Sequence, residues 1–133
     1  MRVYVSSTSE DLHDFRAAVV QQLGRLCHQV VSMEGYTADA RGPVEKCLAD
    51  VASAEVYIGL FAFRYGSIPS GYNFSVTEME FREASERKLH RLIFLVPDDA
   101  TWPMPDGLDE VGKGEERRDV LKCDCPGLPV FIP

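Results

Sequence analysis

Two glutamates near the start of one helical segment, Glu78 and Glu80, are the side chains in this sequence best placed to do chemistry. Each follows a hydroxyl residue, Ser75 or Thr77, by three positions, and this spacing is that of the capping box that opens helices. Only one pair can form the cap, and the change in composition at Phe74-Ser75 favours Ser75. The capping box then gives Glu78 a structural role and leaves Glu80 available for chemistry.

Glu80 shares a helical face with Val76, Thr77 and Ala84, because residues three and four positions apart are neighbours on a helix. This face is mostly small and apolar, so we expect it to pack near a sheet and its loops. Partial desolvation there favours the neutral form of a carboxyl group. Such a group can serve as an acid, a base or a nucleophile. The alternative is a solvated helix residue with no chemical role.

Polar candidates also precede this helix, in a loop that follows the continuous apolar run 56–63. Arg64 is suited to pair with a phosphate or with a carboxylate. Tyr65 is suited to stack on a base or a ribose, and Gly66 permits close approach of the backbone. The alternatives are a surface arginine, a tyrosine that caps the core and a turn glycine.

The elements that must position these residues alternate between strands and helices. Continuous apolar runs at 56–63 and 91–96 predict parallel strands covered on both faces. Further strands are expected at 2–5, 29–32 and 129–132, with helices at about 10–26, 43–53 and 76–88. In the first helix one stripe should face the sheet, formed by Leu12, Phe15, Val19, Leu23 and Leu26. The alternation predicts an α/β fold, a three-layer α/β/α sandwich with a flavodoxin-like parallel sheet of about five strands.

The expected strand order 2-1-3-4-5 places the switch point of the sheet between the first and third strands, where ligands bind in such folds. The loops that meet there are 6–9 and 63–75. Ser7 and Glu10 also have capping-box spacing, so Ser7 is interpreted as a helix cap or as a ligand contact, two compatible roles. The candidate ligand-binding set is therefore Ser6, Ser7, Arg64, Tyr65, Gly66, Ser75 and Thr77.

Composition excludes several function classes. The net charge of -7, without runs of Lys or Arg, argues against nucleic-acid binding. No apolar run approaches the roughly 20 residues of a membrane span, so we expect a cytoplasmic protein without a membrane partner. The pair Cys123-Asp124-Cys125 lacks the further ligands of a metal site, and reduced thiols are expected. No dinucleotide, P-loop or nucleophile-elbow motif occurs, and no cofactor is expected.

The 133 residues fit one domain, 1–133, with a core at 2–97. Residues 98–133 form an acidic, proline-bearing segment that we expect to vary and to contain the last strand. Because that strand is cut off at Pro133, we expect the chain to be the N-terminal part of a longer protein.

Residues 2–97 resemble an uncharacterised TIR-like domain family, which typically heads larger proteins with NTPase modules of the NACHT or STAND type. Six blocks in order carry the resemblance: Val3–Thr8 with the helix after it, Met33-Glu34, Pro43–Leu48, Val56–Gly59, Arg64–Ser67 and Ser75–Glu80. The family looks distantly similar to TIR domains and to nucleoside deoxyribosyltransferases. In those relatives a glutamate near the start of the helix after the third strand acts on the anomeric carbon of a ribosyl group.

In the transferases that glutamate stands in the pattern Glu-x-x-x-Ala, which Glu80–Ala84 matches, so the resemblance assigns Glu80 the catalytic role. The Gly-Lys-Pro turn that usually follows in the transferases is replaced by Lys88–Arg91. The resemblance implies an effector domain that cleaves an N-glycosidic bond of NAD or a related nucleotide in bacterial defence or signalling. The alternatives are a non-catalytic module that self-associates or docks on neighbouring domains of a STAND-type protein, and a nucleotide sensor.

Overall fold

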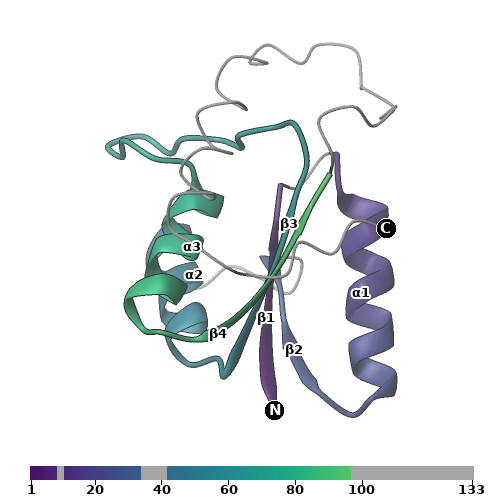
Figure 1. Ribbon diagram of the computed structural model, residues 1–133. Helices are drawn as coiled ribbons and strands as arrows, with labels where there is room; N and C mark the ends of the chain where they lie inside the picture. The colour runs from purple at the N-terminus through teal and green to yellow at the C-terminus, as the bar shows by residue number, and fades with distance from the viewer. Residues whose placement is uncertain (9–10, 34–41, 97–133) are drawn as a thin grey trace.

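The computed structural model describes residues 1–8, 11–33 and 42–96, and these form a parallel sheet with helices on both faces (Figure 1). The sheet has four strands in the order β2-β1-β3-β4. Helix α1 lies on one face, and α2 and α3 lie on the other (Figure 1). In chain order the elements are β1 (Arg2–Ser7), α1 (His13–Arg25), β2 (Gln29–Val31), α2 (Pro43–Ala52), β3 (Val56–Phe61), α3 (Val76–Glu86) and β4 (His90–Leu95).

The predicted three-layer α/β architecture is confirmed, and the order of the described strands agrees with the first four positions of the predicted order. The predicted last strand at 129–132 and the segment 98–133 lie outside the described residues, as do Cys123 and Cys125. The helices within 1–8, 11–33 and 42–96 all fall short of the length and hydropathy that a membrane span requires.

Strand β1 is longer than the sequence pattern predicted. We expected it to end at Val5 with Ser6 in a loop, but Ser6 pairs with Gly59 and Ser7 with Leu60 of β3. Both serines are therefore strand residues, and they point to opposite faces of the sheet, as successive strand residues do. The first two residues of the expected loop 6–9 therefore belong to the strand, and the side chains of Ser6 and Ser7 lie on opposite faces of the sheet.

The core consists of two clusters, one on each face of the sheet. Between the sheet and the α2 and α3 layer, Tyr4 and Tyr57 pack with Phe81 and Ala84. The cluster on the α1 face contains Val3, Val5, Leu12, Ile58 and Leu60. Alternate residues of β1 thus supply both clusters, which explains why this strand and β3 are buried along nearly their whole length.

The predicted stripe of α1 is partly wrong. Leu12 is buried, and Val19 and Leu23 pack on the sheet as expected, but Phe15 and Leu26 are 55% and 68% exposed. The sheet-facing stripe instead continues through Arg16 and Val20. The helix also begins at His13 rather than near Glu10, and its first three residues, 13–15, are exposed.

Among the residues that the structure describes, strand β4 is covered on one face only, which differs from the prediction for the run 91–96. Ile93 is buried in the cluster on the α2 and α3 face, whereas Leu92 and Phe94 are 44% and 36% exposed. The reason is the position of α1, which packs against β1 and β2 at the other side of the sheet. A continuous apolar run therefore did not require two covered faces in this strand.

Candidate functional site

Helix α3 begins with the cap that the sequence predicted. Ser75 has extended backbone angles, φ −65° and ψ 155°, and its hydroxyl accepts the N–H of Glu78 at 3.2 Å. A capping box also has a second hydrogen bond, in which the carboxylate of Glu78 accepts the N–H of Ser75. This part of the prediction is wrong. The Ser75 N–H donates to the hydroxyl of Tyr65 at 3.4 Å, and the Glu78 carboxylate binds other partners. Glu78 is thus structural, but not as the residue that reaches back to its cap.

Glu80 projects from α3 toward the sheet and is fully buried, with 0% of its surface exposed. Its carboxylate accepts two hydrogen bonds from β1: Tyr4 Oη donates to Oε1 at 2.8 Å, and Ser6 Oγ donates to Oε2 at 2.5 Å. Tyr4 and Ser6 lie on the same face of β1 because they are two positions apart. The expected packing of this helix face near the sheet is confirmed, and the solvated alternative for Glu80 is wrong.

The burial of Glu80 follows from the pattern of α3. Phe81 and Ala84, which lie beside it on the helix, are 1% and 0% exposed, so this face is in the core. A buried carboxylate is costly unless it is hydrogen-bonded. The two hydroxyls of β1 supply these bonds, and they fix both carboxylate oxygens at the carboxyl end of the central strands.

Gly66 brings three parts of the chain together at this end of the sheet. Its φ of +91° lies in the left-handed region that glycine tolerates. A Cβ at this position would lie 3.3 Å from Thr77 Oγ1, 3.4 Å from Thr8 Cγ2 and 3.6 Å from Ser75 Cβ. The segment after β3, the end of β1 and the start of α3 therefore meet here, at the switch point that the strand order predicted.

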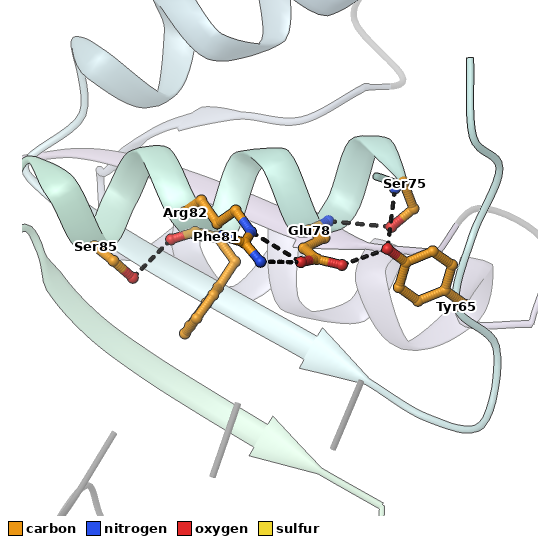
Figure 2. A network of polar contacts seen from close by, with 6 residues as sticks. All are labelled: Tyr65, Ser75, Glu78, Phe81, Arg82 and Ser85. Carbon is orange, nitrogen blue, oxygen red and sulfur yellow. Dashed lines mark hydrogen bonds and ion pairs between the residues drawn. The ribbon is translucent and has the colours of Figure 1, made fainter. Parts of the chain in front are cut away.

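Tyr65 binds the outer side of α3 rather than Glu80 (Figure 2). Its hydroxyl donates to Glu78 Oε2, and Arg82 binds Oε1 through Nε at 2.8 Å and Nη2 at 2.6 Å. Burial, and next the hydrogen bond to Glu78, raise the pKa of Tyr65 above its usual value. Arg64, its neighbour in the chain, is half-buried in the same segment.

Ser7 lies across the sheet from Glu80, on the α1 face. Its hydroxyl accepts a hydrogen bond from Arg16 Nη1 at 2.5 Å and donates to the carbonyl of Thr8 at 3.3 Å. The first residue before α1 is Leu12, which makes no side-chain cap, so the predicted capping role of Ser7 is wrong. The two serines that the sequence grouped in one site serve two different clusters.

Sequence reasoning missed Tyr4 and Arg16. In the sequence Tyr4 is typical of a core residue in a strand. The pattern that could have indicated its contact with Glu80 is its position two residues before Ser6, which puts both side chains on the same face of the strand. Arg16 is 3% exposed and also donates to the carbonyl of Thr8 at 3.1 Å. Its signal is its place four residues after Leu12, which puts a cation on the buried stripe of a helix.

The described part of the chain contains no group of three or more His, Cys, Asp or Glu side chains that could hold a metal ion. In this part Cys27 is exposed, Cys47 is buried, and both are unbridged thiols. The site therefore offers a carboxylate, hydroxyls and backbone groups for its chemistry. The hydroxyls of Tyr4 and Ser6 hold both oxygens of the Glu80 carboxylate in a fixed orientation.

Comparison with known proteins identifies one family and several similar folds. A family model described as "Domain of unknown function (DUF4062)" matches residues 2–121. The structure is similar to a 2-desoxiribosyltransferase from Leishmania mexicana, with a TM-score of 0.51, 14% identity, and coverage of 80% of this chain and 75% of that chain.

A second similar structure is the CMP N-glycosidase BcmB from Clostridium botulinum, with a TM-score of 0.52, 14% identity, and coverage of 92% of this chain and 99% of that chain. A prokaryotic SEFIR domain matches with a TM-score of 0.47 and 12% identity over 99% of this chain and 98% of that chain. At these identities the first two likenesses describe the fold, and they agree with the three-layer α/β architecture expected from the sequence.

Proposed function

The chain belongs to the DUF4062 family, and from the Glu80 site we propose that this domain binds a nucleotide and cleaves its N-glycosidic bond, with NAD or a related nucleotide as substrate. The observation that carries the proposal is the buried Glu80 carboxylate, bound by Tyr4 and Ser6 at the switch point of the sheet. Two proteins of similar fold are named a 2-desoxiribosyltransferase and a CMP N-glycosidase, which supports the choice of reaction.

In the proposed reaction the bond between the anomeric carbon of the ribose and the base nitrogen breaks, and its electron pair leaves with the base. The Glu80 carboxylate stabilises the positive charge that develops on the ribosyl ring, or forms a ribosyl ester with the anomeric carbon, as carboxylates do in glycoside hydrolysis. The oxygen of a water molecule then bonds to the anomeric carbon in place of the base or of the ester oxygen, and one proton of this water passes to the departed base or to solvent. Tyr4 and Ser6 hold the two carboxylate oxygens in a fixed orientation during these steps.

The ligand-binding roles expected from the sequence remain part of this proposal. Arg64 pairs with phosphate, the ring of Tyr65 stacks on the base, and Gly66 allows the backbone to approach the ligand. Ser6, Ser75 and Thr77 complete the set at the end of β1 and the start of α3. Ser7, expected in the same set, lies on the α1 face with Arg16 and is left out of this proposal. Because Glu80 has no exposed surface, contact with a substrate requires movement of the groups that surround it.

The test is release of the base from NAD and from CMP by the concentrated protein, followed by chromatography. The wild-type protein should release nicotinamide or cytosine. Glu80→Gln should lower the rate by at least about a thousandfold, as loss of a nucleophile or charge stabiliser does. Glu83→Gln is the matched control, since Glu83 lies on the same helix and pairs with Arg87 at 2.5 Å in an exposed contact. Base release that persists in folded Glu80→Gln would contradict the proposed mechanism.

A second candidate function is a non-catalytic module that self-associates or docks on neighbouring domains of a longer STAND-type protein. The observation that favours it is the exposure of Ile68 and Phe74, 43% and 39%, in the segment between β3 and α3. This function predicts association that rises with protein concentration and falls in Ile68→Ser, without base release. A protein that stays monomeric in sedimentation velocity at all concentrations and still releases base would exclude it.

A further inference from the structure

The segment between β3 and α3 is tied to the start of α3 by the hydroxyl of Tyr65 and by a backbone bond. Tyr65 Oη accepts the N–H of Ser75 at 3.4 Å and donates to the Glu78 carboxylate (Figure 2). Two residues further, the carbonyl of Ser67 accepts the N–H of Val76 at 3.2 Å. One hydroxyl thus joins the exit of β3 to both the cap and the first turn of the helix.

Gly66, between these two ties, extends the connection toward Glu80. A Cβ at Gly66 would lie 3.3 Å from Thr77 Oγ1 and 3.4 Å from Thr8 Cγ2. Thr77 and Glu80 are three residues apart on α3 and share a helix face. The backbone at position 66 therefore packs on the turn of α3 that precedes Glu80, and on the end of the strand whose hydroxyls bind Glu80.

The acceptor for the Tyr65 hydroxyl is itself held in place. Arg82 occupies Glu78 Oε1 with two N–H groups and leaves Oε2 for Tyr65. Hydrogen bonds to an ionised acceptor are stronger than those between neutral groups. The Arg82 guanidinium also lies 4.3 Å from the ring centroid of Phe74, the residue before the cap. These contacts therefore connect the residues on both sides of the cap with the first two turns of α3.

We infer that Tyr65 is a positioning residue for the Glu80 site: its hydroxyl, through Ser75 and Glu78, fixes the first turn of α3 and so sets the position of the Glu80 carboxylate. This inference rests on the proposed function and deepens it. Tyr65 acts through α3 in this role, and its hydroxyl does not touch the substrate. The ring remains able to stack on a base, which is a separate role that the aromatic side chain keeps without its hydroxyl.

The test compares Tyr65→Phe with Tyr72→Phe. Tyr72 lies in the same segment, and its hydroxyl also donates to a glutamate, Glu45, at 3.3 Å on the surface. Tyr65→Phe keeps the ring and should lower kcat for base release by about 10- to 100-fold with little change in KM, because small misplacement of a reacting group costs this much. Tyr72→Phe should leave both constants at the wild-type values.

Changes at Glu78 separate positioning from a general loss of structure. Glu78→Gln keeps an acceptor oxygen for Tyr65 and should retain most of the kcat that Glu78→Ala loses. The double variant Tyr65→Phe/Glu78→Ala should be no slower than the slower single variant, since both changes break one connection. Additive losses in the double variant, an unchanged or higher kcat in Tyr65→Phe, or a loss that appears in KM alone would overturn the inference.

Amide hydrogen exchange tests the same connection without a substrate. Tyr65→Phe should speed exchange at Ser75 and Val76, and Tyr72→Phe should not. If the wild-type protein releases no base from any nucleotide, the proposed function fails, while the exchange rates still decide whether Tyr65 fixes the start of α3. Exchange at the wild-type rate in Tyr65→Phe would overturn the positioning role even in an active enzyme.

Discussion

Glu78 and Glu80 lie two residues apart on α3 and face opposite sides of the helix. Glu80 is fully buried against β1 and accepts hydrogen bonds from the hydroxyls of Tyr4 and Ser6. Glu78 is 8% exposed at the rim and accepts from Tyr65 and from the guanidinium of Arg82. Two glutamates thus have different environments: Glu80 lies in the core and is bound by hydroxyls, and Glu78 lies near the surface in an ion pair.

The difference between the two environments suits the two glutamates to different tasks. The ion pair of Glu78 satisfies its charge, so this carboxylate is a good anchor for the Tyr65 hydroxyl and a poor reagent. The hydroxyls of β1 orient the Glu80 carboxylate without a cation among these donors. A carboxylate whose two oxygens are held in a fixed orientation suits the proposed role at a developing oxocarbenium centre. The structural contacts of Glu78 and the proposed chemical role of Glu80 therefore belong to residues two positions apart on the same helix.

The largest effect on stability should come from the buried carboxylate. Tyr4→Phe removes the donor to Oε1 of Glu80, and a buried acceptor without its donor costs about 1–3 kcal/mol of the free energy of unfolding. Tyr65→Phe, the same substitution at the other glutamate, should cost less than about 1 kcal/mol, because water can reach that site. Urea denaturation of both variants measures the two values. Equal costs would show that the environments differ less than the contacts indicate.

The roles of Ser75 and of the inward face of α3 were predictable because both depend on local spacing. A hydroxyl three residues before a glutamate gives the cap, and the small residues one turn on either side of Glu80 give the face. The buried β3 was also predictable, since a run without alternation needs cover on both faces in the centre of a sheet. These patterns are complete within about a dozen residues.

The separation of Ser6 from Ser7 was not predictable in the same way. Two serines after a short apolar strand read as the start of a turn, and only the pairing of Ser6 with Gly59, far along the chain, shows that the strand continues. Arg16 was missed for a related reason. Its spacing from Leu12 places it on the buried stripe, but the acceptors that satisfy its charge, at Ser7 and Thr8, lie outside the helix and are not given by that spacing.

A smaller effect is expected from the ion pair at the rim. Arg82→Gln should lower the free energy of unfolding by about 0.7–1.5 kcal/mol, the sum of an i, i+4 ion pair and the contact with the Phe74 ring. Arg87→Gln is the control, because Arg87 makes an i, i+4 pair with Glu83 on the same helix. It should cost less than Arg82→Gln.

Added salt should sharpen this contrast between the two glutamates. Screening weakens ion pairs near the surface more than hydrogen bonds in the core. Denaturation at low and high salt should therefore reduce the cost of Arg82→Gln and leave the cost of Tyr4→Phe unchanged. A salt-dependent cost for Tyr4→Phe would indicate that the Glu80 carboxylate is exposed to solvent ions, in conflict with its burial.

The smallest expected effect is a change of stability at alkaline pH that comes from Tyr65. Burial and the Glu78 carboxylate raise the pKa of Tyr65 above its ordinary value of 10.0, so the folded protein holds this proton more tightly than the unfolded chain. The contribution of Tyr65 is thus fully present below the unfolded pKa and is lost as the pH rises through the higher folded pKa. The difference in free energy of unfolding between the wild-type protein and Tyr65→Phe should be constant at neutral pH and shrink only above about pH 10. Urea denaturation across this range measures the difference, and a decrease at lower pH would assign the titration to another group.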